Sequence, residues 1–321
     1  MRIPMLAILI IFFVAFNIFF INQGNFVHEI VESVQDVKGR VLGAQEEIQK
    51  LPIAQSIKQK PVMPKKIDQT SEFDLLVNSG AAIDCKSRSM LFSKQVDQVW
   101  PIASITKLMT ALVFLDYNPD WDEIYQIKPA DIRNGGKVYL SIGARVKIKD
   151  LFYLSLVGSA NTATIALIQA TGLTQEEFVK QMNQKAEDLG LANTYFADPI
   201  GLSNNNISTA REIAKFAQVA FANENISQAG LTKKYEFNTL SGKRIIVNNT
   251  DALLDIFLQN GVRILGGKTG FIKTAGYCFV SKFVDEAGQE IITVVLGADS
   301  NKARFSQTKE LVNWVYQNYQ W

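Results

Sequence analysis

The sequence predicts an α/β (α+β) fold in which one sheet takes strands from both ends of the folded body and carries helices on both faces. Three observations predict it. Alternating apolar segments lie near the start of the body and recur in its C-terminal third, and a strongly apolar helical block separates them. An apolar fraction of 47% over 321 residues supplies enough buried surface for such a core.

The N-terminal segment predicts a membrane anchor. Residues 3–21 are apolar except for Pro4 and Asn17, and no charge lies between Arg2 and Glu29. The run is long enough to cross a bilayer as a helix, is longer than the apolar h-region of a usual cleaved signal peptide, and is followed by no A-x-A-like cleavage site. We therefore expect residues 1–22 to be an uncleaved single-pass anchor, with the rest of the chain on the outer face by the positive-inside rule.

Residues 23–71 predict a stalk helix and a linker. Apolar side chains recur there at alternating steps of three and four, as in a heptad seam, although Gly39 and Gly43 interrupt it. The seam suits a short coiled coil that would join two chains as a homodimer, or else a single amphipathic helix on the membrane surface. The run KQKPVMPKK, with two prolines and four lysines, predicts an extended linker.

The folded body, residues 72–321, predicts strands first, then helices, then strands again. Alternation predicts a strand pair at 75–84 and 89–92, and the helix predicted over 104–117 is apolar on most faces and should be buried. The next helix starts are marked by two capping boxes, Thr174 with Glu177 and Thr209 with Glu212. The remaining predicted elements are helices at 178–189 and 213–221, strands at 234–237, 244–247, 263–268, 277–283 and 291–296, and a helix at 302–319.

Charge and cysteine content exclude several classes of function. The net charge is +2 with scattered lysines and arginines, so we expect no nucleic-acid partner. The only cysteines, Cys85 and Cys278, lie far apart and outside any CxxC or Cys/His spacing, which indicates neither a zinc site nor a disulfide framework. We expect two buried thiols, with pairing as the alternative, and neither a metal nor another cofactor.

Histidine content narrows the chemistry further. The only histidine is His28, beside the apolar N-terminal run and outside the folded body. A Ser-His-Asp or Cys-His hydrolase needs an imidazole in that body, and a HExxH zinc peptidase needs two. If the chain is a hydrolase, its general base must be Lys, Asp, Glu or Tyr.

The sequence Ser104-Ile105-Thr106-Lys107 at the start of the buried helix offers a nucleophile and such a base. A spacing of three residues puts the Ser104 hydroxyl and the Lys107 amine on one helical face. Burial and the positive end of the helix both lower the pKa of a lysine, which an amine needs in order to accept a proton from serine near neutral pH. Alone, this spacing is weak evidence for a catalytic pair, because a serine that caps the helix N-terminus explains it equally well.

Two further motifs follow in order, separated by 55 and 109 residues. Ser159 and Asn161 lie between two apolar helical segments, where a hydroxyl can relay a proton and an amide can hold a substrate amide. Lys268, Thr269 and Gly270 end a predicted strand, where a cation and a hydroxyl suit a carboxylate and glycine allows a backbone to approach. Either motif alone could be a simple turn; together with Ser104 and Lys107 they predict a serine acyl-transfer site.

This ordered set is the one that class A β-lactamases and penicillin-binding proteins share. From about residue 72 onward the chain resembles the D-alanyl-D-alanine carboxypeptidase family of low-molecular-mass penicillin-binding proteins (serine peptidase S11 type). Further matching segments flank the motifs: PIA at 101–103, LMTA at 108–111, DPIGL at 198–202, STAR at 208–211 and AGY at 275–277. The resemblance implies a β-lactamase/DD-peptidase-like fold, with an antiparallel sheet covered by helices on both faces and an all-helical subdomain.

The resemblance also implies a role for each site residue. Ser104 would be acylated, with Lys107 as its base and Ser159 as the proton relay. Asn161 would position the substrate, and Lys268 with Thr269 and Gly270 would bind its terminal carboxylate. The backbone N–H groups of Ser104 and Phe271 would form the oxyanion hole.

The implied substrate is a peptidoglycan stem peptide ending in D-Ala-D-Ala, with β-lactam antibiotics as acylating inhibitors, at the outer face of a bacterial cell membrane. Thr162 departs from the Asp that often follows the second motif, which puts the positioning of that loop in question. Three alternatives stay open: a peptidoglycan DD-endopeptidase, a serine β-lactamase and a non-catalytic wall-binding protein. The region 193–202 offers Asp198 but lacks the Glu pattern of a class A β-lactamase, so slow deacylation of penicillin is expected.

Overall fold

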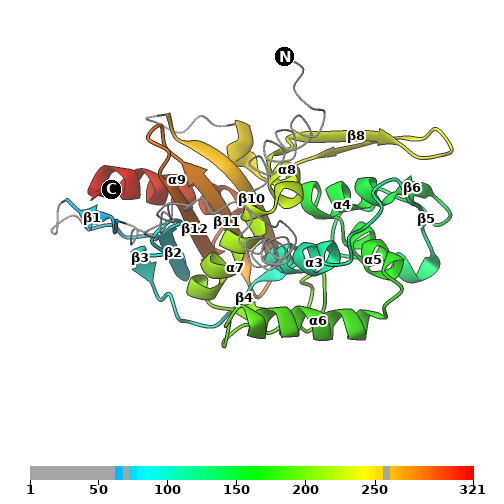
Figure 1. Cartoon of the computed structure of the whole chain (residues 1–321), viewed down its shortest axis with the longest axis horizontal. Helices are drawn as coiled ribbons and strands as arrows, with labels where there is room; N and C mark the ends of the chain where they lie inside the picture. Colours follow the sequence, from blue (N-terminus) through cyan, green and yellow to red (C-terminus); the bar gives the residue numbers. More distant parts are fainter. Residues whose placement is uncertain (1–61, 68–71, 256–260) are drawn as a thin grey trace, which may run out of the picture. The chain divides into compact units, whose positions relative to one another are not determined.

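A five-stranded antiparallel sheet joins the two ends of the folded body. The computed structural model describes residues 62–67, 72–255 and 261–321. Strand order in the sheet is β10-β11-β12-β2-β3, so the two early strands extend a meander of three late ones (Figure 1). The bounds are β2 Ser79–Asp84, β3 Met90–Lys94, β10 Arg263–Ile272, β11 Gly276–Val284 and β12 Glu290–Ala298. The predicted sheet with strands from both termini is confirmed.

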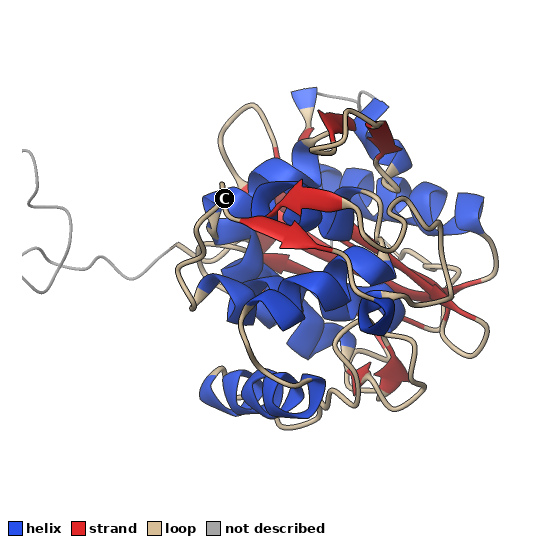
Figure 2. Cartoon of the chain, turned by 90° about the vertical axis from the view of Figure 1, so that its right-hand side faces the viewer, coloured by secondary structure: helices blue, strands red, loops and turns tan. Residues whose placement is uncertain are grey.

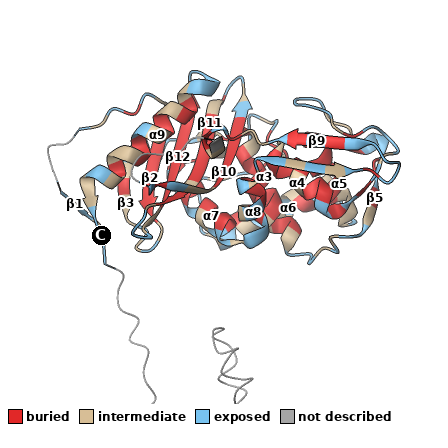
Figure 3. Cartoon of the chain, turned by 90° about the horizontal axis from the view of Figure 1, so that it is seen from above, coloured by how far each residue is buried: buried red, intermediate tan, exposed pale blue. Residues whose placement is uncertain are grey.

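Helices cover both faces of this sheet, as Figure 2 shows. Helix α9 (Asn301–Asn318) packs on one face, and α7 (Ala210–Ala222) with α8 (Glu224–Leu231) packs on the other. Alternation along β12 feeds both layers, because Val294 belongs to the core on the α7 side and Val295 to the core on the α9 side. The central strands are therefore apolar on both faces and almost wholly buried (Figure 3).

A helical subdomain lies beside the sheet and packs around the buried helix α3. Its helices are α3 Thr106–Leu115, α4 Ile148–Val157, α5 Asn161–Ala170 and α6 Gln175–Asp188. Helix α3 contacts α4, α5, α6 and α7, which explains why it is apolar on most of its faces (Figure 1). Both the buried position of this helix and the all-helical subdomain agree with the expectation from sequence.

Small hairpins and turns complete the described body. The predicted strands at 234–237 and 244–247 form a hairpin of their own outside the main sheet, resting on α4 through Tyr235, whose ring stacks on Tyr153 at 4.3 Å. Alternation indicates strands but does not choose their partners. The remaining elements are β4 Trp100–Pro101 with β7 Ile207–Ser208, β5 Ile124–Gln126 with β6 Arg145–Lys147, β8 Lys234–Asn238 with β9 Arg244–Asn248, and the 3-10 turns η1 Ala103–Ile105, η2 Pro129–Asp131 and η3 Ala252–Asp255.

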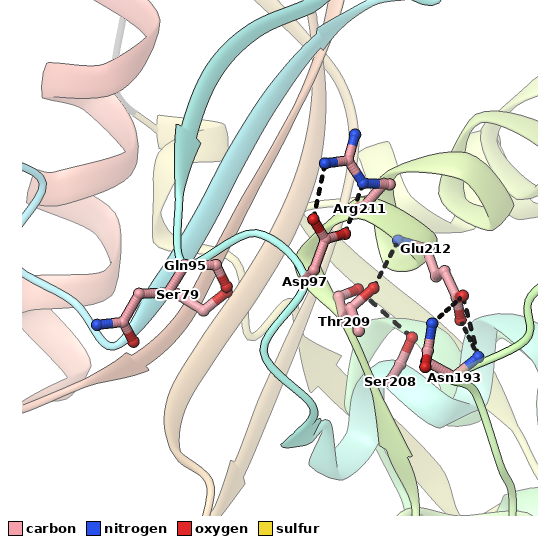
Figure 4. Close-up of polar contacts among 8 residues, drawn as sticks. All are labelled: Ser79, Gln95, Asp97, Asn193, Ser208, Thr209, Arg211 and Glu212. Atoms are coloured by element: carbon pink, nitrogen blue, oxygen red, sulfur yellow. Dashed lines mark hydrogen bonds and ion pairs between the residues drawn. The ribbon is translucent and has the colours of Figure 1, made fainter.

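Of the two predicted capping boxes, one is complete and one is half made. Thr174 and Glu177 bond reciprocally at the start of α6. Thr209 accepts the backbone N–H of Glu212, but the Glu212 carboxylate turns away and accepts from Asn193 instead, as Figure 4 shows. The glutamate thus ties a distant loop to α7, a long-range contact that outcompetes the local one.

The same end of α7 is tied to the chain that leads toward the site. Arg211 donates to both oxygens of Asp97, at 2.6 and 2.9 Å (Figure 4). Its backbone N–H donates to the carbonyl of Val96. At the preceding residue, the Ser79 hydroxyl donates to the carbonyl of Gln95 at 3.0 Å. Residues 95–97 of the connection from β3 to β4 are therefore held by both the sheet and α7.

Four boundaries differ from the sequence prediction. Residues 75–78 lie outside β2, because the Val77 N–H turns back to the carbonyl of Leu75. Ser104 lies in a 3-10 turn before α3 rather than on the helix itself. The segment 268–270 lies inside β10 rather than at its end. The C-terminal helix ends at Asn318, because Tyr319–Gln320 form strand β13, paired antiparallel with β1 (Lys65–Lys66).

Cys85 and Cys278 are both free thiols; Cys278 is buried as expected, whereas Cys85 is only half-buried. Burial raises the pKa of each to about 12, so neither is a reactive thiolate near neutral pH. Within the part of the chain that the structure describes, no helix combines the length and the apolar character needed to cross a membrane. The predicted anchor and stalk lie outside the described residues.

Candidate active site

Ser104 lies where the helical subdomain meets the edge strand β10, in the turn η1 between β4 and α3. The preceding residue, Ala103, has φ +48°, a left-handed conformation that costs a residue with a Cβ about 1–2 kcal/mol. Its carbonyl packs so closely against Gly201 that a Cβ there would lie 2.0 Å from the oxygen. A Cβ on Gly270 would lie 2.8 Å from the carbonyl oxygen of Ile102. Glycine is needed at both positions so that the backbone can enclose the nucleophile from two sides.

Lys107, the second residue of α3, is fully buried and points at Ser104. Its Nζ donates to Ser104 Oγ at 2.9 Å, to Asn161 Oδ1 at 2.8 Å and to the carbonyl oxygen of Ile200 at 2.6 Å. Burial lowers the pKa of Lys107 to about 7, although the negative charge of Asp198 acts in the opposite direction. A large fraction of the amine is therefore neutral at physiological pH and can accept the Ser104 proton.

Asn161 connects Lys107 to a neighbouring loop. Its side-chain oxygen accepts from Lys107, and its side-chain nitrogen donates to the carbonyl oxygens of Asn134 and Gly135. The side chain is buried at the start of α5. Sequence reasoning assigns the amide to the substrate; in the structure it orients the base and holds the 134–135 loop.

Thr162, the departure from the family pattern, supports the same loop. Its Oγ1 accepts the backbone N–H of Arg133 at 3.2 Å. A hydroxyl here therefore performs a positioning role that a carboxylate could also perform, which answers the question that the sequence raised.

Ser159 and Lys268 form a second Ser–Lys contact, across 109 residues of sequence. Ser159 sits in the turn between α4 and α5 with φ +53°, and its Oγ accepts from Lys268 Nζ at 2.9 Å. Lys268 is buried in β10 and donates also to the carbonyl of Thr269 at 3.0 Å. Burial lowers the pKa of Lys268 well below its ordinary range, and repulsion by Lys107 and Arg304 lowers it further.

Thr269 and Gly270 bring in two residues that sequence reasoning missed. Thr269 Oγ1 shares a 2.6 Å hydrogen bond with Thr250 Oγ1, and Arg304 Nη1 on α9 donates to the carbonyl oxygen of Gly270 at 3.0 Å. Burial lowers the pKa of Arg304 to about 10. An arginine on the apolar face of the predicted C-terminal helix was the available signal for Arg304, whereas Thr250 had none.

Phe271 follows the third motif on β10. The residue is 51% exposed, and its ring stacks on Tyr277 at 4.3 Å between ring centroids. A Cβ on Gly270 would lie 3.3 Å from the backbone nitrogen of Ser104. The two N–H groups predicted to form the oxyanion hole, those of Ser104 and Phe271, therefore belong to segments that pack directly against each other.

The loop at 198–203 fixes the carbonyl of Ile200 that Lys107 contacts. The Asp198 carboxylate accepts four backbone N–H groups at 2.5 to 3.3 Å, those of Ile200, Gly201, Leu202 and Ser203. Asn206, which sequence reasoning also missed, accepts the backbone N–H of Asp198 and donates to Thr106 Oγ1 at 2.9 Å. The loop is thereby fastened to the start of α3.

Comparison with known sequences agrees with this geometry. The sequence model of the peptidase S11 family, described as D-alanyl-D-alanine carboxypeptidase, matches residues 66–300. The chain belongs to this family. It is therefore an enzyme of a serine hydrolase family, and the resemblance inferred from the motifs is confirmed.

Individual relatives carry two activities in their names. The chain is 30% identical over 265 residues to a D-alanyl-D-alanine endopeptidase of Escherichia coli (strain K12), covering 79% of this chain and 84% of the relative. It is 28% identical over 258 residues to the D-alanyl-D-alanine carboxypeptidase DacF of Bacillus subtilis (strain 168), covering 78% of this chain and 65% of that protein.

Among solved structures, the Streptomyces K15 DD-transpeptidase superposes with a TM-score of 0.71 at 28% identity, covering 77% of this chain and 99% of that one. The fold is thus that of the DD-peptidases.

Proposed function

We propose that this chain is a serine-type D-Ala-D-Ala carboxypeptidase that trims peptidoglycan stem peptides through an acyl-enzyme on Ser104. The observation that carries the proposal is the 2.9 Å contact between Lys107 Nζ and Ser104 Oγ, made by a buried lysine whose pKa is lowered to about 7. Family membership supports the same chemistry.

Acylation follows from this contact. Neutral Lys107 accepts the Ser104 proton while Oγ bonds to the carbonyl carbon of the penultimate D-Ala, and the backbone N–H groups of Ser104 and Phe271 stabilise the oxyanion. The C–N bond then breaks, and the proton that Lys107 accepted is passed through the Ser159 hydroxyl to the departing D-Ala amine, which restores both Lys107 and Ser159. Ser159 is suited to this step because its oxygen is held by Lys268 Nζ at 2.9 Å.

The terminal carboxylate of the substrate suits the end of the site where cations gather. Lys268, Thr269 and Arg304 place an ammonium, a hydroxyl and a guanidinium around the Gly270 segment of β10. Both cations are buried, so a carboxylate would meet them in a low dielectric, where charge-assisted hydrogen bonds are strong. This arrangement favours substrates with a free C-terminus.

Slow deacylation of penicillin is part of the proposal. A class A β-lactamase activates its deacylating water with a glutamate. The carboxylate that this chain offers nearby, Asp198, has both oxygens engaged by four backbone N–H groups. β-Lactams should therefore act as acylating inhibitors rather than as substrates.

The proposed location is the outer face of a bacterial cell membrane. The support is the apolar run at 3–21, with Arg2 before it and the catalytic body after it. Homodimerisation through the heptad seam of the stalk is a secondary proposal that rests on the sequence pattern alone.

A DD-endopeptidase acting on peptidoglycan cross-links is the second candidate. The specific observation in its favour is the Escherichia coli relative named as an endopeptidase, of which the chain spans 84% against 65% for the DacF carboxypeptidase. Both reactions use the same acyl-enzyme and differ in the amine that departs.

Incubation of the purified chain with a labelled penicillin, followed by intact-mass measurement over time, tests the shared chemistry. A stable adduct on Ser104 supports the proposal, rapid turnover indicates a β-lactamase, and a folded protein without adduct refutes both. Digestion of purified muropeptides then separates the two DD-peptidase activities, because a carboxypeptidase releases D-Ala from monomeric pentapeptides and an endopeptidase converts cross-linked dimers to monomers.

A further inference from the structure

Asp251 is a buried carboxylate that the reaction described above does not use. It lies between β9 and the 3-10 turn η3, beside β10. Its Oδ1 accepts the backbone N–H of Leu253 at 2.8 Å, and its own N–H donates to Asn249 Oδ1 at 2.9 Å. Capping of η3 engages Oδ1, and Oδ2 points toward β10.

Oδ2 of Asp251 lies against the backbone of β10 immediately before Lys268. A Cβ on Gly267 would lie 2.5 Å from this oxygen and 2.9 Å from the ring of Phe279. Gly267 has no positive φ, so the need for glycine comes from this close approach and not from backbone conformation. The carboxylate therefore lies close to β10 at the residue before Lys268.

The charges around Lys268 are unbalanced without Asp251. Lys107 on α3 and Arg304 on α9 both repel the Lys268 ammonium, while Asp251 is the carboxylate that attracts it, and Asp251 acts on Arg304 in the same way. Buried cations lose their protons readily unless a counter-charge is close. A neutral Lys268 would offer a weaker partner to a carboxylate.

We propose that Asp251 is a positioning residue for substrate binding, a counter-charge behind β10 that keeps Lys268 protonated where the substrate carboxylate binds. This inference rests on the proposed DD-peptidase function. Without the negative charge, Lys268 must gain a proton at the moment of binding, so affinity for a carboxylate falls as the pH rises. The acylation step itself is unaffected, because Ser104 and Lys107 keep their contacts.

The test compares Asp251→Asn with the unchanged full chain on two substrates, an acyl-D-Ala-D-Ala peptide and the same peptide with a C-terminal amide. We expect the alkaline limb of kcat/KM for the free acid to move to lower pH in the variant, because the negative charge of Asp251 opposes loss of the Lys268 proton. At pH values above that limb, the variant should have a lower kcat/KM than the unchanged chain, mainly because its KM is higher. For the amide substrate, the ratio of the kcat/KM values of the two enzymes should not change with pH.

Asp84→Asn is the matched control. Asp84 is also buried and also accepts a backbone N–H, that of Ser87, but it lies at the far end of β2. Asp84→Asn should lower the stability of the fold and leave the pH profile of kcat/KM unchanged. An Asp251→Asn enzyme that behaves in the same way, with lower stability and an unchanged profile, overturns the inference and leaves Asp251 as a cap.

Lysine-labelled NMR of the unchanged chain gives a second measurement that requires no Asp251 variant to fold. The Lys268 signal, assigned with Lys268→Arg, should report an ammonium at pH 7, and a neutral Lys268 at that pH overturns the inference. The proposed function fails separately, if the unchanged chain neither turns over D-Ala-D-Ala peptides nor forms a penicillin adduct.

Discussion

The pH dependence of acylation follows directly from the burial of Lys107. Burial lowers the pKa of this lysine from 10.5 to about 7, so at pH 7 roughly half of the amine is neutral, against roughly one part in three thousand for an exposed lysine. The second-order rate constant of penicillin acylation should therefore rise about tenfold per pH unit below 7 and level off above it.

Loss of the Lys268 proton should add a falling limb to this profile, because a neutral Lys268 is a weaker partner for the penicillin carboxylate. Burial lowers the pKa of Lys268 well below its ordinary range, and the repulsion from Lys107 that lowers it further disappears once Lys107 is neutral. The assay is intact-mass measurement of adduct formation from pH 5 to pH 9.5 at constant ionic strength. A rate that still climbs tenfold per unit beyond pH 9, or one that is flat from pH 5, refutes the assignment of Lys107 as the base.

The same pKa shift predicts how stability changes with pH. The unfolded chain releases its Lys107 proton near pH 10.5 and the folded chain near 7, so between these values the unfolded state binds more protons. Stability from this group therefore rises with pH across that window, by as much as about 1.4 kcal/mol per unit and about 5 kcal/mol in all.

The thiols Cys85 and Cys278, whose pKa values are raised to about 12, oppose the rise above pH 9. Denaturant unfolding should therefore be compared between pH 7 and pH 9, where Lys107→Met should make the rise less steep and leave the part that the lowered pKa of Lys268 contributes. An equal slope in that variant would contradict the assigned shift.

Three further changes test the site. Lys107→Ala should slow acylation by about 10²–10⁴-fold, the usual worth of a general base, while circular dichroism shows an intact fold; acylation at an unchanged rate would rule out the base. Gly201→Ala should lower the free energy of unfolding by more than about 2 kcal/mol and slow acylation, because its Cβ would lie 2.0 Å from a carbonyl oxygen. Gly172→Ala is the control, because Gly172 has the same φ of +82° but faces open space; it should lower the free energy of unfolding by about 1 kcal/mol and leave acylation unchanged. Thr250→Val removes the hydrogen-bond partner of Thr269 and should raise KM about fivefold, corresponding to about 1 kcal/mol, with kcat little changed; a fall in kcat alone would place Thr250 elsewhere in the reaction.

Local pattern was enough to predict the elements that are defined within a few residues. The complete capping box at Thr174 and the strands of the C-terminal meander were predicted correctly, because backbone propensity and periodicity act over short distances. Where a distant group competes, local pattern fails. Glu212 leaves its expected partner for Asn193, and the strand at 234–237 joins a hairpin rather than the main sheet.

The sequence by itself determined the chemical groups of the site. The absence of a histidine from the body left Lys107 as the leading base, and its spacing from Ser104 is a property of one turn of chain. Only the tertiary structure decided what those groups contact and how they ionise. The contacts of Lys107 with Ile200 and of Lys268 with Ser159 join residues 93 and 109 positions apart, and the enclosure that lowers the two lysine pKa values comes from segments just as distant. Desolvation depends on everything packed around a group, and no local pattern records that.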